Sequence, residues 1–249
     1  MVDTGNRRLT ARSVLASTLL GADPPELPVA HLVELSSLFG INANRARVAL
    51  SRMVASGEVT TDGTGRYRLS GHLLDRQRRQ NASRSGRTHR WRGNWLVVVI
   101  TTTGSTAEVR NNRRRALTFA RLAELREGVW LRPDNLDVKL PADLGPDITR
   151  WSARSDHPDE VVRRLWPTTA WAERAEDLCG QLDACPPRDW TDLEPGFVLS
   201  ASVLRHFQAD PLLPTELLPA DWPGDRLRAV YDEWDARYRQ VLANWAPSA

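Results

Sequence analysis

The sequence has few of the residues that build disulfide frameworks or metal sites. Its two cysteines, Cys179 and Cys185, are too few for a disulfide framework, and no cysteine–histidine cluster surrounds them. The five histidines are scattered, without the spacing of metal ligands. A G-x-S-x-G elbow, a P-loop and a G-x-G-x-x-G turn are also missing. We therefore expect a protein of the reducing cytoplasm with no cofactor, no metal ion and no catalytic residues.

Long apolar runs are missing as well. The longest, Trp95 to Ile100, has the length of a strand and is far too short for a membrane span, so no membrane contact is expected. The N-terminus carries Arg7, Arg8 and Arg12 but no apolar stretch with a cleavage site, so no secretory signal is predicted. With 41% hydrophobic and 26% charged residues, the composition is that of an ordinary globular protein, and 249 residues usually form two or more domains.

Lysine is nearly absent, since Lys139 is the only one and all other cationic side chains are arginines or histidines. The formal net charge is only +3. Residues 1–115, however, hold 19 arginines and 8 acids, whereas residues 116–249 hold 15 Lys+Arg and 23 acids. All ten tryptophans lie at position 91 or later. Such an asymmetry indicates that the basic half contacts nucleic acid or another anionic surface.

Three short helices are predicted before residue 57. Their predicted bounds are Ala11–Leu20, Val29–Phe39 and Asn44–Ser56, and the Pro- and acid-rich stretch Gly21–Leu27 is predicted to be a loop. The third helix buries apolar residues at i, i+3, i+4 and i+7, which are Ala46, Ala49, Leu50 and Met53. Its other faces are polar.

Two short strands follow, Val59–Thr61 and Arg66–Leu69, separated by the turn sequence Asp62-Gly63-Thr64-Gly65. Three helices followed by a basic hairpin are the order of a winged helix-turn-helix, a fold that places its recognition helix in the major groove of DNA. On the third helix the candidate DNA contacts are Asn44, Arg45, Arg47, Ser51 and Arg52. Arg66 and Arg68 on the hairpin are candidate contacts to phosphates, because one strand face offers little base specificity.

Residues 72–92 form a basic linker, predicted to be helical at first and flexible afterwards. Its arginines are either a solvated face or contacts to the DNA backbone. Residues 93–168 alternate predicted strands and helices, with a buried strand at Trp95–Ile100, and indicate a small α/β unit of the split βαβ or ferredoxin-like kind. Residues 169–249 are predominantly helical and contain a Pro-rich stretch after Asp210 that is predicted to be an ordered loop.

Four stretches resemble PaaX-type repressors, the bacterial regulators of phenylacetic acid catabolism. They begin at Gly40-Ile-Asn-Ala-Asn-Arg, Trp91-Arg-Gly-Asn-Trp, Gly128-Val-Trp-Leu-Arg-Pro and Asp210-Pro, in the same order along the chain as in the family. The resemblance implies an α+β multidomain protein. Its parts would be a winged helix-turn-helix at residues 1–71, the linker 72–92, a ferredoxin-like domain at 93–168 and a helical domain at 169–249.

The resemblance also implies a dimeric repressor that binds a palindromic operator in double-stranded DNA and is released by an acyl-CoA such as phenylacetyl-CoA. Cations would hold the phosphates of that effector. The candidate effector-binding residues are Arg113, Arg114, Trp130, Arg132 and His206. The central domain is similar to a small CRISPR spacer-acquisition nuclease, but here the stretch from Ile100 to Gly104 has no carboxylate to hold a metal ion.

Two alternatives to a DNA-binding regulator stay open at this point. One is an enzyme that processes nucleic acid or a thioester through the central domain. The other is a winged helix that contacts a protein partner, with the acidic C-terminal half as the docking surface. A nuclease assay and a gel shift would separate these alternatives from the regulator.

Overall fold

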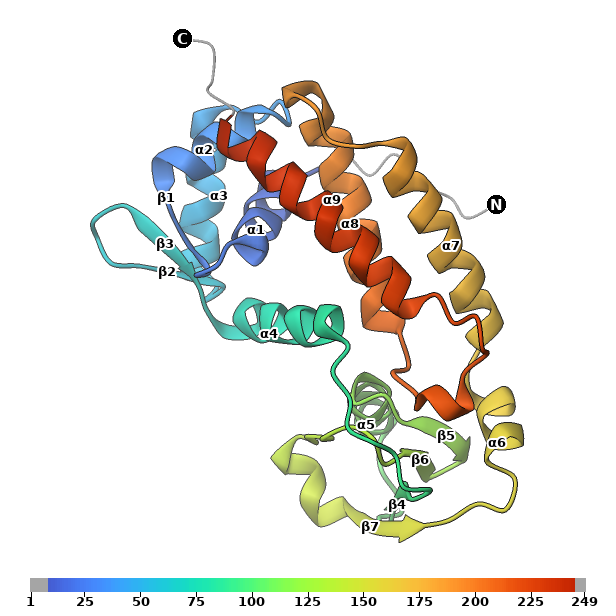
Figure 1. Ribbon diagram of the computed structural model, residues 1–249. Coiled ribbons are helices and arrows are strands. Elements are labelled where there is room, and N and C mark those ends of the chain that lie inside the picture. The colour runs from blue at the N-terminus through green and yellow to red at the C-terminus, as the bar shows by residue number, and fades with distance from the viewer. Residues whose placement is uncertain (1–8, 245–249) are drawn as a thin grey trace. The chain divides into compact units, whose positions relative to one another are not determined.

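A computed structural model describes residues 9–244, with only the backbone described at position 143 (Figure 1). Residues 1–8, which include Arg7 and Arg8, and residues 245–249 lie outside the described part. The fold is mixed α+β, and its contacts divide it into two compact units. Of the described residues, the first unit contains 9–84, Gln181–Gln208 and 230–244; the second contains Ser85–Gly180 and Ala209–Ala229.

The N-terminal part of the first unit is a bundle of helices with a small antiparallel sheet in the order β1-β3-β2. Its elements are α1 (Ala11–Gly21), β1 (Glu26–Pro28), α2 (Val29–Ser37), α3 (Ala43–Ala55), β2 (Val59–Thr61), β3 (Arg66–Leu69) and α4 (Gly71–Ser85). A capping box starts α1, because the Thr10 hydroxyl accepts from the Ser13 amide at 3.1 Å while the Ser13 hydroxyl accepts from the Thr10 amide. The apolar faces of α1, α2 and α3 meet in one core around Leu15, Leu32 and Leu50.

The C-terminal elements are α7 (Thr168–Ala184), η2 (Trp190–Asp192), α8 (Leu193–Ala209), η3 (Thr215–Leu217) and α9 (Gly224–Asn244). Most of α8 and α9 belongs to the first unit and packs beside the N-terminal bundle. The rings of Phe39 and Phe197 lie 4.9 Å apart, centre to centre. The Tyr238 hydroxyl donates to the carbonyl of Leu193 at 2.8 Å and so joins α9 to α8.

The second unit is built on a four-stranded antiparallel sheet in the order β5-β6-β4-β7. Its elements are β4 (Trp95–Ile100), α5 (Ala107–Phe119), β5 (Ala123–Arg126), β6 (Val129–Pro133), η1 (Ala142–Asp147), β7 (Ile148–Ala153) and α6 (Pro158–Leu165). Helix α5 connects β4 to β5, which lie two positions apart with β6 between them. The last strand of the unit, β7, pairs with β4 on the opposite side.

Both faces of this sheet are covered by apolar side chains. Because side chains alternate along a strand, Leu96, Val98 and Ile100 face one side of the sheet. Trp95 and Val97 face the other side. Val98 packs in a cluster with Trp130 and Leu117 of α5. Trp95 packs with Leu131 and with residues of α6 and the segment around η3, including Val162 and Leu213. Strand β6 and much of β4 are therefore buried, whereas the edge strand β7 is largely exposed. The first half of the Pro-rich stretch after Asp210 is buried and packs on the Trp95 side of the sheet through Leu213.

The strands predicted at Val59–Thr61, Arg66–Leu69 and Trp95–Ile100 are confirmed at these bounds. The predicted loop Gly21–Leu27 is partly wrong, because Glu26–Pro28 pairs with β3 as a strand. A strand of three residues is too short to show a periodic pattern in the sequence, so only its pairing with β3 identifies Glu26–Pro28 as a strand. Strand β5 begins at Ala123, since Arg121 has a φ of 64° in the left-handed region and cannot be part of an extended strand.

The helix predicted at Val29–Phe39 ends at Ser37. The hydroxyls of Ser36 and Ser37 turn back to the carbonyls of Leu32 and Glu34, which is the way serine competes with helix continuation. The domain bounds 1–71, 72–92, 93–168 and 169–249 stay a prediction. The compact units follow spatial contact instead of chain order, and helices after residue 180 contribute to both of them.

Candidate nucleic-acid interface

Helix α3 presents a polar face to solvent because most of its apolar residues are buried in the core. The Asn42 side chain caps its start by accepting from the Arg45 amide at 3.0 Å. Ala46, Leu50 and Met53 are buried at 1% exposure or less and hold the helix against α1 and α2. The rest of the helix surface is available to a partner.

The five sequence-predicted contacts on α3 are all exposed: Asn44, Arg45, Arg47, Ser51 and Arg52. Among the described residues, the guanidinium groups of the three arginines have neither a hydrogen-bond nor an ion-pair partner. Unpaired guanidinium groups keep all five donors for an incoming acceptor, which suits guanine edges and phosphates. The structure therefore brings these residues together on one solvent-facing surface.

Val48 lies on the same exposed surface and is missing from the sequence prediction. Its side chain is 43% exposed, in the middle of the polar face. An apolar side chain there can contact the methyl group of thymine. The available signal was its position, since Val48 does not follow the i, i+3, i+4 spacing of the buried residues.

The two hairpin arginines are exposed but are not unpaired. The Glu26 carboxylate lies between them: one oxygen accepts from Arg66 Nε at 2.5 Å and the other from Arg68 Nε at 2.7 Å. The pairing of β1 with β3 places Glu26 directly opposite Arg68. These ion pairs, with Arg66 first and Arg68 second, lower the pKa of Glu26 below its usual value. Glu26 was not predicted as a site residue, because its strand is visible only in the tertiary structure.

Behind this surface, the last turn of α4 is attached to α9 within the same unit. Arg84 donates to Asp235 at 2.8 Å and to Asp232 at 2.8 Å, and its guanidinium lies 4.8 Å from the ring centre of Tyr231. Arg239 donates to the carbonyl of Gly21 at the end of α1. Helix α9 therefore contacts the N-terminal bundle at two places.

Of the five candidate effector residues, the first two form ion pairs within the second unit. Arg113 is 7% exposed, donates to the Ser105 hydroxyl at 2.8 Å and pairs with Asp147. Arg114 is exposed and pairs with Glu124 at 2.8 Å. These contacts join α5 to the loops and to β5, a role that Arg residues play without any ligand.

Arg132 is fully buried and is bonded to neutral acceptors. Its Nη2 donates to the Asn135 side chain at 2.9 Å and to the Leu212 carbonyl at 3.0 Å, and its Nη1 donates to the Arg121 carbonyl at 3.4 Å. Leu212 and Arg121 both have positive φ, at 48° and 64°. Burial, with Arg121 next in effect, lowers the pKa of Arg132 to about 9, so the group stays charged at neutral pH. Arg132 therefore holds two strained backbone positions.

The remaining two candidates are enclosed to different degrees. Trp130 is 3% exposed in the core on the α5 side of the sheet, and its indole N–H has no hydrogen-bond partner among the described residues. His206 is half-buried in the last turn of α8 and belongs to the first unit, whereas the other four belong to the second.

Two family models match the chain. Residues 10–73 match the family described as PaaX-like protein, and residues 166–247 match the PaaX-like protein C-terminal domain. The chain belongs to the PaaX-like family. This confirms the resemblance seen in the sequence, and because PaaX-like proteins are transcriptional regulators, it makes this protein a member of a family that binds DNA.

One solved structure similar to this PaaX-like chain is the uncharacterized protein Rv0674 from Mycobacterium tuberculosis. The two are 41% identical in sequence and superpose with a TM-score of 0.77, and the match covers 94% of this chain and 98% of the other. No curated protein is significantly similar to the chain.

The described residues 9–244 show neither a membrane span nor a metal-binding cluster. None of the described helices is both long and apolar enough to cross a membrane. Within the same residues no group of three or more His, Cys, Asp and Glu side chains is arranged to hold a metal ion. The exposed face of α3 is thus the surface whose chemistry fits the family.

Proposed function

We propose that this PaaX-like protein is a transcriptional repressor that binds a palindromic operator as a homodimer. Residues 11–70 would act as a winged helix-turn-helix, with α3 in the major groove and the β2–β3 hairpin as the wing. A small acidic effector, an aryl-CoA or a related acid, would release the operator. Repression would follow from occlusion of the promoter.

One observation carries the proposal: the three α3 arginines have no side-chain partner among residues 9–244, although they lie beside the buried face of the same helix. Helix α3 contains no acidic side chain that could pair with them along its own surface. Here Arg45, Arg47 and Arg52 are presented together with Asn44 and Ser51, the side chains that read base edges. The order of the elements supports the same assignment, since three helices precede the β2–β3 hairpin. Strand β1 pairs with β3 and completes a three-stranded sheet.

The second unit supports a ferredoxin-like domain in this proposal. Counting its strands along the chain from β4, the sheet order is 2-3-1-4 with every neighbour antiparallel, and α5 makes the first crossover. That order is the one expected for a split βαβ arrangement. The short η1 occupies the position where such a fold has its second crossover helix.

Release by an effector requires two arrangements of the protein with different affinities for the effector. Contacts of α9 to α4 and α1 supply an element through which such a difference could reach the DNA-binding helices. An effector that binds both arrangements equally would shift nothing. The proposal therefore predicts that the effector binds more weakly in the presence of operator DNA.

The proposal is tested by DNA binding of an Arg47→Ala variant. The probe is the DNA duplex upstream of the protein's own gene, and its binding is measured by fluorescence anisotropy. An unrelated duplex of equal length serves as the comparison for sequence preference. Arg47→Ala is expected to weaken binding to the preferred duplex by about 5- to 150-fold, because a base-contacting arginine contributes about 1–3 kcal/mol. Binding of the wild type should weaken steeply with salt, because phosphate contacts release counterions.

Arg237→Ala is the matched control, since Arg237 is an exposed arginine on α9, away from α3 in sequence. It should bind DNA like the wild type. Unchanged affinity and sequence preference in Arg47→Ala would refute the assignment of α3 to the groove. Absence of DNA binding in the wild type would instead favour a winged helix that contacts protein.

A further inference from the structure

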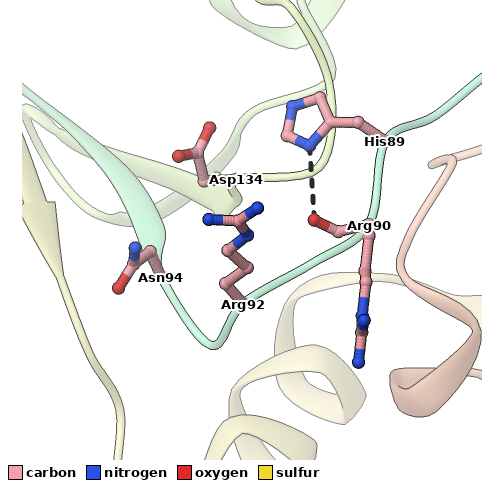
Figure 2. Close-up of a pocket in the computed structure, with 5 residues that line it drawn as sticks. All are labelled: His89, Arg90, Arg92, Asn94 and Asp134. Carbon is pink, nitrogen blue, oxygen red and sulfur yellow. Dashed lines mark hydrogen bonds between the residues drawn. The ribbon is translucent and has the colours of Figure 1, made fainter.

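A cavity of about 320 Å³ in the second unit is lined by His89, Arg90, Arg92, Asn94 and Asp134 (Figure 2). It lies between the segment that leads into β4 and the turn that follows β6. We call it the linker pocket. Its volume is within the usual range of small-molecule sites. None of its residues belongs to the DNA-binding surface or to the five effector candidates.

The walls of the linker pocket are fixed by hydrogen bonds from both sides. The Asp134 amide donates to the Asn94 carbonyl at 2.9 Å, and the His89 amide donates to the Asn135 carbonyl at 2.9 Å. Arg154 supports the outer wall by donating to the Asn94 side-chain oxygen at 3.2 Å and to the Arg92 carbonyl at 3.3 Å. A site held in this way loses little freedom when a ligand enters.

Opposite charges face the linker pocket without meeting. In Figure 2 the Arg92 side chain extends toward Asp134, whereas that of Arg90 extends the opposite way. Among residues 9–244, neither the Arg92 guanidinium nor the Asp134 carboxylate has a hydrogen-bond or ion-pair partner. A guanidinium and a carboxylate that stay unpaired across a cavity can each take a different part of one ligand.

His89 and Asn94 supply the other polar groups of the pocket. His89 Nδ1 donates to the Arg90 carbonyl over a long 3.5 Å contact, which makes Nε2 the acceptor of that tautomer. Because Arg154 occupies the Asn94 side-chain oxygen, the amide NH₂ of Asn94 is the part left to a ligand. The Arg92 guanidinium and the Asn94 NH₂ together offer more than two N–H donors, which suits the three oxygens of a phosphoryl group better than the two of a carboxylate.

We propose that the linker pocket binds a phosphorylated small molecule that carries a hydroxyl or amino group close to its phosphate, as nucleotides and sugar phosphates do. Arg92 and Asn94 donate to the oxygens of the phosphoryl group, and Asp134 accepts a hydrogen bond from the hydroxyl or amino group. The DNA backbone offers the same phosphates but no donor beside them, so Asp134 repels it. This site is independent of the proposed repressor function.

The Asp134 side of the linker pocket is connected to the buried interior of the second unit. Asn135, next to Asp134, donates from its side chain to the Leu212 carbonyl at 3.0 Å and accepts from the buried Arg132 at 2.9 Å. Leu212 lies in the stretch that joins α8 to α9. Ligand binding should therefore stabilise this stretch, and hydrogen exchange of residues 210–214 should slow when ligand is present.

Isothermal titration of the full chain tests the site with four probes: ADP, ribose 5-phosphate, pyrophosphate and adenosine. The wild type should bind ADP or ribose 5-phosphate, and pyrophosphate more weakly, but should not bind adenosine. Arg92→Ala should weaken binding of the phosphorylated probes by about 10- to 100-fold, because it removes a charge-assisted contact. Asp134→Asn should weaken ADP and ribose 5-phosphate but leave pyrophosphate unchanged or tighter.

Arg150→Ala is the matched control, because Arg150 is an exposed arginine on β7 of the same unit, and its affinities should equal those of the wild type. Circular dichroism checks that each variant is folded. The proposal is overturned if none of the three phosphorylated probes binds at millimolar concentration, or if Arg92→Ala binds them like the wild type. It is also overturned if Arg92→Ala loses affinity only for duplex DNA, since the phosphate partner would then be the DNA backbone.

Discussion

Arginines in two regions of the molecule, helix α3 and strand β6, have opposite surroundings. On α3, Arg45, Arg47 and Arg52 are exposed and have no partner among the described side chains. On β6, Arg132 is completely buried and donates to four acceptors, three of them backbone carbonyls. The same side chain therefore serves binding in one region and stability in the other, and its partners determine which.

The hairpin arginines lie between these two cases. Arg66 and Arg68 reach solvent like the α3 arginines, but they share one carboxylate, that of Glu26. A phosphate that approaches them has to compete with Glu26. This difference predicts that the hairpin contributes less to DNA affinity than α3, although the sequence of the two elements is similarly basic.

The largest effect is expected from removing the buried arginine. Arg132→Met should lower the free energy of unfolding by about 3 kcal/mol or more, because it removes the donor to the Arg121 carbonyl and to the Asn135 side-chain oxygen, and one of the two donors to the Leu212 carbonyl. The thermal midpoint measured by circular dichroism should then fall by roughly 6 °C or more. Arg150→Met, at an exposed position, should leave the midpoint unchanged. If Arg132→Met had the same thermal midpoint as the wild type, burial would not distinguish arginines that stabilise the fold from arginines that are available for binding.

An intermediate effect is expected from Glu26→Gln. Loss of the shared carboxylate leaves Arg66 and Arg68 to the phosphates, so DNA affinity at low salt should rise about three- to tenfold and its salt dependence should steepen by one to two phosphate equivalents. Anisotropy titrations at several salt concentrations measure both quantities. Glu34→Gln, which removes an acid of α2 that forms no ion pair among the described residues, controls for the change in net charge. Equal gains in both variants would contradict a specific role of Glu26.

The smallest effect concerns acid stability of the N-terminal bundle. Glu58 is 6% exposed and accepts from Arg12, and this pairing lowers the pKa of Glu58 below its ordinary 4.5. A carboxylate with a lower pKa in the folded state stabilises the protein above its unfolded pKa and loses that contribution as pH falls through the folded value. The wild type should therefore unfold at a higher temperature than Glu58→Gln at pH 7.

The same difference should shrink as the pH falls below the pKa of an unfolded glutamate, about 4.3, and through the lower folded pKa of Glu58, because the carboxyl group then becomes protonated in both states of the wild type. Thermal melts at several pH values measure it. Glu233→Gln is a suitable control, because Glu233 is exposed on α9 and has no ion pair among the described residues. A midpoint difference that stays constant from pH 7 to pH 3 would mean that the Arg12–Glu58 pair does not stabilise the bundle.

The local pattern was sufficient to predict the elements that carry the candidate DNA surface. The apolar spacing of Ala46, Leu50 and Met53 predicted which face of α3 is buried and therefore which face carries Arg47. The turn sequence at Asp62 predicted the hairpin at the bounds that the structure has. These features depend on residues within one or two helical turns, so neighbouring residues specify them.

Other features depend on residues that are distant in the chain. Glu26 meets Arg66 and Arg68 across 40 positions, and Leu212 meets Arg132 across 80. No periodicity within β1 or within the Pro-rich stretch indicates these partners. The linker pocket likewise combines residues 89–94 with Asp134, which the sequence separates by a strand, a helix and a hairpin.

By itself the sequence determined the family, the three helices and the hairpin within residues 11–69, and the residues that α3 turns to solvent, because each of these is encoded in local spacing and in ordered motifs. Only the tertiary structure decided which arginines are available. Arg113 and Arg132 read like Arg47 in the sequence, yet one is paired with Asp147 and the other is enclosed by carbonyls. Availability depends on burial and on partners from distant segments, and those are set only when the chain packs.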